Sequence, residues 1–188
     1  MATIGDMARA VAAICLGAGL GTGLGSGPAY AQDGGTRDHL QLGVGYFDVF
    51  DQDEDSIEFG AIYRPGVRYL DLGSRPGEIW QGVGPQIGAS LNTDGGALGH
   101  AGLFLDIRPF DNVVVWPGVN VAAWEDGDSR DLGGTFQFMS ELYVGYRLPW
   151  SDLVGVSLQH VSNAGIHDDN PGTETLSLTY TVSFGPLF

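Results

Sequence analysis

Lysine is absent from this chain of 188 residues, and only eight arginines oppose 23 acidic residues, which gives a formal net charge of −15. Such a chain has no basic patch that could neutralise phosphates, so we exclude nucleic acid as a partner. The single cysteine, Cys15, cannot form an intrachain disulfide. Apolar runs of about 18 residues are missing after residue 31, so no helix is expected to span a membrane, although a closed barrel could do so.

The N-terminal segment is typical of an export signal. Residues 10–24 are apolar and rich in glycine, and Ala29-Tyr30-Ala31 forms a cleavage site of the A-x-A kind before Gln32. A transmembrane anchor is the alternative, but so many small residues make a poor spanning helix. We therefore predict a cleaved signal peptide over residues 1–31 and one domain over residues 32–188.

The sequence of this domain predicts eight strands. Most of the runs alternate between apolar and polar residues, as half-buried strands do, and no helical periodicity lasts for more than about a turn. The runs cover roughly 39–50, 56–70, 77–91, 96–108, 110–122, 134–148, 152–162 and 173–185. Because proline cannot donate to a ladder, we expect bulges or local breaks at Pro65, Pro85 and Pro117.

The connections between these runs alternate in character. Those after the odd-numbered runs are polar or acidic, whereas those after the even-numbered runs are mostly turn-like, at 71–76, 108–110 and 148–151. This asymmetry and the terminal aromatic Phe188 are typical of outer-membrane barrels. We predict an all-β fold, an eight-stranded antiparallel transmembrane β-barrel whose interior is filled by side chains.

Charges of both signs lie on the polar face of the predicted barrel and could pair inside a narrow lumen. They are Glu58, Arg64, Arg68, Asp106, Arg108, Glu141 and Arg147, with His100 beside them. A soluble lipocalin-like barrel, apolar inside and polar outside, would show the same alternation. The paired charges and the asymmetry of the connections favour the membrane barrel.

The last two strands carry a group of residues suited to catalysis. His160 and Ser162 are two positions apart, so they share a face with Cα atoms roughly 6.5–7 Å apart. Glu174 begins the next strand on the same face, which is otherwise apolar. A base, a hydroxyl nucleophile and an orienting carboxylate predict an esterase that meets an apolar substrate. A polar rim that only contacts lipid headgroups is the alternative.

The stretch His160-Val161-Ser162-Asn163-Ala164-Gly165, followed by Asn170-Pro171-Gly172 and Glu174, resembles the lipid A 3-O-deacylase family of Gram-negative outer membranes. The family motif is His-x-Ser-Asn with a glutamate twelve residues after the serine. The resemblance implies Ser162 as nucleophile, His160 as base and Glu174 as orienting carboxylate. It also implies Asn163 and the Gly165 amide as oxyanion-hole donors, with Asn170 near the site.

The same resemblance implies lipid A, or lipopolysaccharide of the outer leaflet, as the substrate. It further implies an outer-membrane location and neither metal nor cofactor; His167-Asp168-Asp169 is read as a solvated loop tip rather than as metal ligands. A homodimer is compatible with this architecture. A non-catalytic structural or adhesion barrel is the second hypothesis, and a soluble lipocalin-like carrier is the third.

Overall fold

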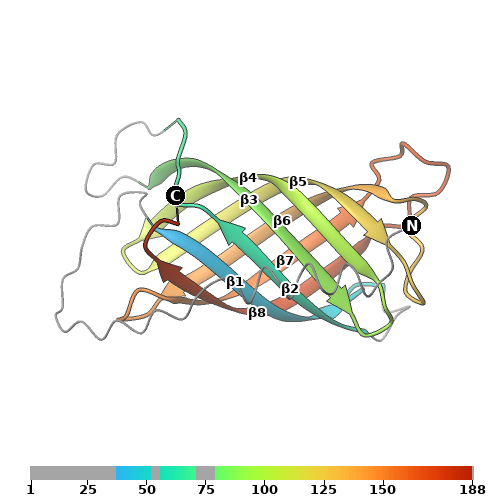
Figure 1. The fold of residues 1–188 in the computed structure, drawn as a ribbon, viewed down its shortest axis with the longest axis horizontal. Coiled ribbons are helices and arrows are strands. Elements are labelled where there is room, and N and C mark those ends of the chain that lie inside the picture. Colours follow the sequence, from blue (N-terminus) through green and yellow to red (C-terminus); the bar gives the residue numbers. More distant parts are fainter. Residues whose placement is uncertain (1–36, 52–55, 71–78, 188) are drawn as a thin grey trace. The chain divides into compact units, whose positions relative to one another are not determined.

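Eight antiparallel strands follow one another around a closed barrel in this computed structural model, which describes residues 37–51, 56–70 and 79–187 (Figure 1). The predicted signal peptide lies outside the described residues. The strands are β1 (Asp38–Phe47), β2 (Ser56–Arg64), β3 (Trp80–Asn92), β4 (Ala97–Phe110), β5 (Val113–Glu125), β6 (Phe136–Arg147), β7 (Leu153–Ser162) and β8 (Thr173–Phe184). The predicted all-β, eight-stranded fold is confirmed. No helix among these residues is long and apolar enough to cross a membrane.

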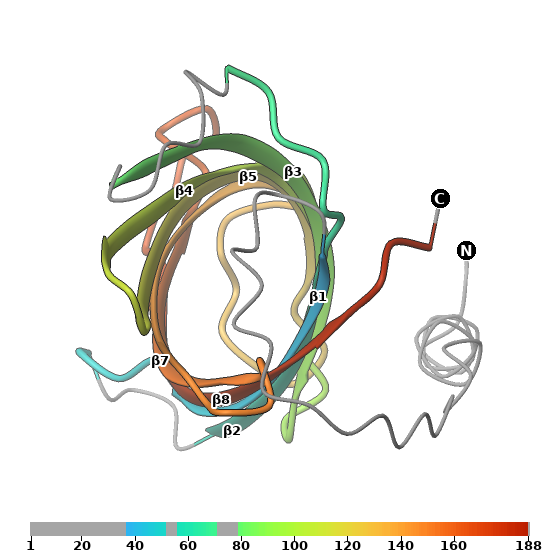
Figure 2. The same cartoon turned by 90° about the vertical axis from the view of Figure 1, so that its left-hand side faces the viewer.

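The barrel has two distinct ends. We call the end with the β1–β2, β3–β4, β5–β6 and β7–β8 connections the loop end, and the opposite end, where β1 starts and β8 finishes, the terminal end. Figure 2 looks along the barrel from the terminal end and shows the strands forming a ring, which β1 and β8 close by pairing from Asp38↔Phe184 to Phe47↔Thr175. Because the barrel is closed, each strand pairs with a neighbouring strand on both sides.

Several strand boundaries differ from the prediction, including the ends of β2 and β4. β2 ends at Arg64 rather than at residue 70, because Pro65 has no N–H to continue the ladder. The turn predicted at 71–76 lies outside the described residues, and β3 begins at Trp80. β4 continues to Phe110 through the predicted turn at 108–110, and the turn lies instead at Asp111 and Asn112.

The other two prolines sit within paired strands. The predicted break at Pro85 is wrong, since its pairing with Leu103 of β4 is in register. Pro85 lies beyond the last pair of β2 with β3, Tyr63↔Ile87, so its missing N–H removes no hydrogen bond to β2. Pro117 pairs in register with Leu142 of β6. On the β4 side, the pairs pass from Phe104↔Gly118 directly to Ile107↔Val115, which is a local break at Pro117.

The outer wall is apolar and the inner wall is largely polar. β8 is rich in threonine and in apolar residues that favour strands, and its alternate residues differ in exposure: Leu178 is 69% exposed, whereas Thr179 is 7% exposed. β6 alternates in the same way along its length. A surface of exposed leucine, valine and phenylalanine around a closed barrel is that of a transmembrane barrel. It excludes the lipocalin-like arrangement.

Paired charges fill the middle of the lumen, as the sequence predicts. Arg64 Nη2 lies 2.6 Å from Glu141 Oε2, and both side chains are fully buried. Gln41 and Gln86 accept further hydrogen bonds from the same guanidinium, and Ser157 donates to Glu141. The Arg64 guanidinium carbon also lies 5.1 Å from the centre of the Trp116 ring. A lumen packed in this way leaves no route for a lipid.

Apolar side chains also enter the lumen, which the sequence analysis did not predict. One buried cluster, the upper cluster, contains Phe47, Leu98, Ala122, Trp124, Leu132, Met139 and Val161. A second buried cluster contains Phe104, Val114, Trp116, Tyr143 and Leu153. The upper cluster includes Leu132 of the β5–β6 connection, so it fixes part of that connection at the loop end.

Candidate active site

The pairing of β7 with β8 brings the three predicted catalytic residues together at the loop end. His160 is the Cα partner of Glu174, and Ser162 lies two residues farther along β7. On the other side of β7, Ser162 is the Cα partner of Phe138 in β6. Since residues two apart share a face, the three side chains all lie on the outer wall.

Their side chains form a continuous hydrogen-bonded series. His160 Nδ1 lies 2.8 Å from Glu174 Oε1, and His160 Nε2 lies 3.1 Å from Ser162 Oγ. A carboxylate can only accept, so Nδ1 carries the proton and Nε2 is left to accept from the serine hydroxyl. The His160 side chain is 47% exposed and Glu174 is 21% exposed, so a substrate can reach the site from outside the barrel. This order of nucleophile, base and orienting carboxylate suits acyl transfer.

The predicted oxyanion-hole donors lie immediately after Ser162 and already have acceptors. Asn163 Nδ2 donates to the carbonyl oxygens of Leu132 and Asp169, at 3.0 and 2.6 Å. The Gly165 N–H donates to Asn163 Oδ1 at 2.9 Å. Asn163 is fully buried, so its side chain organises the β7–β8 connection. Either donor would bind an oxyanion only by exchanging its present acceptor.

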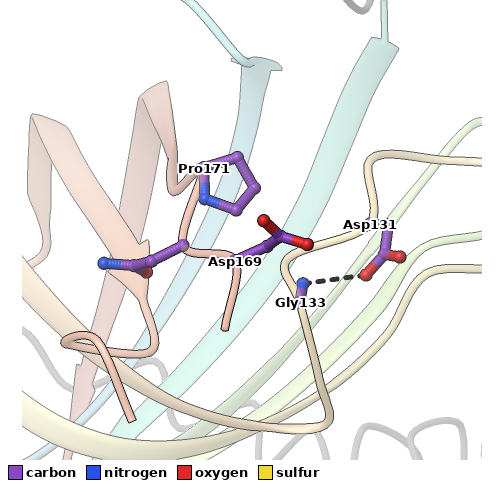
Figure 3. A pocket seen from close by; sticks show the side chains of 5 residues that line it. Asp131, Gly133, Asp169 and Pro171 are labelled. Carbon is purple, nitrogen blue, oxygen red and sulfur yellow. Dashed lines mark hydrogen bonds between the residues drawn. The ribbon is translucent and has the colours of Figure 1, made fainter. Parts of the chain in front are cut away.

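Asn170 lies close to the nucleophile through the backbone. Its Oδ1 accepts a hydrogen bond from the Asn163 N–H at 2.9 Å. Asn170 also lines an open pocket between the β5–β6 and β7–β8 connections, together with Asp131, Gly133, Asp169 and Pro171 (Figure 3). Asp131 Oδ1 accepts from the Gly133 N–H at 2.8 Å, which shapes one wall of this pocket.

Within the described residues, no three histidine, cysteine, aspartate or glutamate side chains are grouped as metal ligands. His167 of the predicted loop tip lies beside Gly134 of the β5–β6 connection. A Cβ atom added at Gly134 would contact the imidazole of His167. The series of Glu174, His160 and Ser162 consists of groups that can move protons without a metal.

An ion pair near the site was missed by the sequence analysis. Arg130 of the β5–β6 connection bonds Asp48 Oδ1 at 2.6 Å and Asp51 Oδ2 at 2.9 Å. Burial opposes the charged form, but the hydrogen bonds to these two carboxylates raise the pKa of Arg130 above its ordinary value. The sequence singles out Arg130, because it is the only arginine in the four connections of the loop end, but it does not identify the acidic partner.

Comparison with known proteins decides the family. A sequence profile of the family described as lipid A 3-O-deacylase (PagL) matches residues 30–183. The chain belongs to the lipid A 3-O-deacylase family. The match includes seven whole strands, all but the last residue of β8, and the residues His160, Ser162 and Glu174. The resemblance seen in residues 160–174 therefore extends over the barrel.

Two members of the family share local sequence identity with this chain. The lipid A deacylase PagL of Bordetella bronchiseptica is 42% identical over 55 residues, which are 29% of this chain and 31% of that protein. The lipid A deacylase PagL of Pseudomonas aeruginosa is 34% identical over 79 residues, which are 40% of this chain and 43% of that protein. The chain thus spans less than half the length of each relative.

The fold is also that of a solved family structure. The crystal structure of the outer membrane enzyme PagL superposes with a TM-score of 0.61 at 18% sequence identity, and covers 77% of this chain and 98% of that one. One structure from the de novo design of transmembrane β-barrels superposes with a TM-score of 0.50 at 10% identity, and covers 79% of this chain and 96% of that one. At these identities the likeness concerns the barrel alone.

Proposed function

We propose that this protein is an outer-membrane esterase that hydrolyses the 3-O-linked acyl chain of lipid A by a Ser162-His160-Glu174 mechanism. The observation that carries the proposal is the hydrogen-bonded series from Glu174 through His160 to Ser162 on the apolar outer wall. Membership of the lipid A 3-O-deacylase family supports the substrate. An inert structural barrel would have no need of a base and a nucleophile aligned on a lipid-facing surface.

The reaction follows from the order of these groups. Ser162 Oγ attacks the ester carbonyl carbon while its proton passes to His160 Nε2. Collapse of the tetrahedral intermediate breaks the bond to the 3-oxygen of the sugar, and that oxygen takes the proton from Nε2. Water then attacks the acyl-enzyme, gives a proton to the same nitrogen, and the fatty acid leaves as the proton returns to Ser162. Glu174 holds the imidazole in the required tautomer and stabilises its charged form.

The oxyanion of each tetrahedral intermediate needs donors. Asn163 and the Gly165 amide are our candidates because both lie within three residues of the nucleophile. Donors of this kind are worth about 10²–10³-fold in rate. In this proposal, arrival of the acyl carbonyl replaces the acceptors that the two groups now have.

The placement in the membrane follows from the two walls of the barrel. Its apolar outer wall would be surrounded by lipid, and the loop end would face outward, as in outer-membrane barrels with both termini on the periplasmic side. The catalytic residues would then lie level with the sugars of lipid A in the outer leaflet. We further propose cleavage of the signal peptide at residue 31. A homodimer stays a prediction.

The proposal is tested by mass spectrometry of lipid A from cells that express the wild-type protein or Ser162→Ala. We expect the wild-type protein to yield lipid A that lacks one 3-hydroxy acyl chain, and the variant to leave lipid A intact while it still assembles in the outer membrane. Intact lipid A with both proteins would support the structural or adhesion barrel instead.

A further inference from the structure

A shielded ion pair joins two connections that are far apart in the sequence. Arg130 of the β5–β6 connection meets Asp48 of the β1–β2 connection, and the side chains are 14% and 0% exposed. Asp51, the second partner of Arg130, is 52% exposed, so solvent screens that contact. The contact with Asp48 is therefore the stronger link between the two connections.

The Asp48 side of this pair reaches the residue that orients the base. Asp48 Oδ1 accepts a hydrogen bond from Thr173 Oγ1 at 3.3 Å. The neighbouring Val49 N–H donates to the Glu174 carbonyl at 3.0 Å. The β1–β2 connection thus holds the first two residues of β8, one of which is the catalytic carboxylate.

The Arg130 side reaches the nucleophile. The Arg130 carbonyl accepts from Trp124 Nε1 at 3.1 Å, which fixes the connection against the upper cluster. Two residues later, the Leu132 carbonyl accepts from Asn163 Nδ2 at 3.0 Å. Asn163 directly follows Ser162, so the connection that carries Arg130 also holds the end of β7.

Ser162 needs such support because the sheet does not hold it on both sides. The β7–β8 ladder ends with the pair Val161↔Thr173, one residue before Ser162. Only β6 pairs with Ser162, through Phe138. The position of the nucleophile relative to Glu174 therefore depends on the connections as well as on strand pairing.

We propose that Arg130 and Asp48 form a positioning pair for the esterase site, one that fixes the segment carrying Glu174 relative to the segment carrying Ser162. Neither residue touches the substrate. The inference rests on the proposed function for its natural substrate, but the geometry concerns the reactivity of Ser162 towards any acyl group. A misplacement of about 1 Å in such a site lowers the rate by about 10²-fold.

The test compares Arg130→Gln and Asp48→Asn with the wild-type protein refolded in detergent. We expect each change to lower kcat for a short soluble ester, and the rate at which a fluorophosphonate labels Ser162, by about tenfold or more. KM and the heat-modifiable migration of the barrel should change little. Arg130→Lys, which retains the charge, should restore part of the labelling rate.

Asp128→Asn is the matched control, because it removes one exposed carboxylate from the same connection. It should label at the wild-type rate. The double variant Asp48→Asn/Arg130→Gln leaves no unpaired buried charge, so it is judged on the same readouts if a single variant does not assemble. Wild-type kcat and labelling in folded Arg130→Gln, or in the folded double variant, would overturn the positioning role.

The two proposals fail in distinguishable ways. If lipid A in cells stays intact while labelling of Ser162 depends on Arg130, the lipid A substrate is wrong and the positioning pair stands. If wild-type and Arg130→Gln proteins deacylate lipid A at the same rate, the pair is wrong and the function stands. Absence of Ser162-dependent labelling in the wild-type protein would overturn both.

Discussion

His160 and Glu174 are Cα partners across β7 and β8, and their side chains meet at 2.8 Å. The sheet itself therefore sets the distance between base and carboxylate. Ser162 approaches the other imidazole nitrogen from the same strand as His160, at 3.1 Å. Strand pairing thus places His160 beside Glu174, while Ser162 lies one residue beyond the end of the β7–β8 ladder. In the proposed mechanism His160 is the base, so its removal should be more damaging than removal of the carboxylate that orients it.

Alanine substitutions should separate these roles. We expect His160→Ala to lower kcat by about 10²–10⁴-fold, since it removes proton transfer. Glu174→Ala should lower kcat less, because the base stays in place and loses only its orientation and charge stabilisation. Initial rates of fatty-acid release by the refolded proteins measure both. A larger loss with Glu174→Ala would mean that the two roles are assigned wrongly.

The sequence was sufficient to predict the facing of β7 and β8 and the juxtaposition of His160, Ser162 and Glu174 on them. Side chains of a strand alternate between its two faces, so the face of one residue fixes the faces of all the others. The motif from His160 to Glu174 lies within these two alternating runs. The sequence could not predict the pairing of Arg130 with Asp48, which are 82 positions apart and meet only because the barrel closes.

The alternation of apolar and polar residues also could not predict where strands end or which apolar residues lie inside the lumen. Pro65 ends β2, whereas Pro85 and Pro117 stay within strands, because the outcome depends on which neighbouring strand needs the missing N–H. Val161 points inward although it is apolar, since it packs in the upper cluster. Burial of this kind follows from the whole barrel and not from one strand.

The outward orientation of Leu178 predicts different effects on stability for arginine and for phenylalanine at this position. Leu178 is 69% exposed on the outer wall. Leu178→Arg should lower the free energy of unfolding in lipid by about 2–4 kcal/mol near mid-membrane, while Leu178→Phe stays apolar and should be nearly neutral. Ser177→Phe, on the packed inner wall, should instead cost about 1–3 kcal/mol through overpacking. Denaturant midpoints in lipid vesicles give these values, and equal costs for arginine and phenylalanine at position 178 would contradict the facing.

The ion pair between Arg64 and Glu141 predicts a non-additive effect on stability. Glu141→Leu leaves Arg64 as an unpaired buried charge and should destabilise the barrel by about 3–5 kcal/mol. The double variant Arg64→Met/Glu141→Leu removes both charges and should lose less than the single variant. Urea unfolding of the three proteins tests the prediction. A double variant less stable than Glu141→Leu would show that Arg64 contributes chiefly through its ring contacts and glutamine partners.

The outer wall below the site should hold the acyl chains of the substrate. Leu158 and Leu176 are Cα partners on β7 and β8, two residues from His160 and Glu174, respectively. The packed lumen offers no path, so we expect the proposed substrate, lipid A, to arrive laterally from the membrane. We expect Leu158→Ala/Leu176→Ala to raise the KM for lipid A by about tenfold, since each lost apolar contact weakens binding of the chain. The KM for a short soluble ester should change much less.

Ser177→Ala serves as the control for lateral access, because this residue neighbours Leu176 on the same strand but is buried on the inner wall. It removes a side-chain oxygen from the lumen and leaves the outer wall intact, so the KM for lipid A should stay at the wild-type value. If the inner-wall change stops turnover in a folded barrel while the two outer-wall changes leave KM unaltered, the acyl chains do not bind along the outer wall. The substrate would then have to reach Ser162 from the loop end.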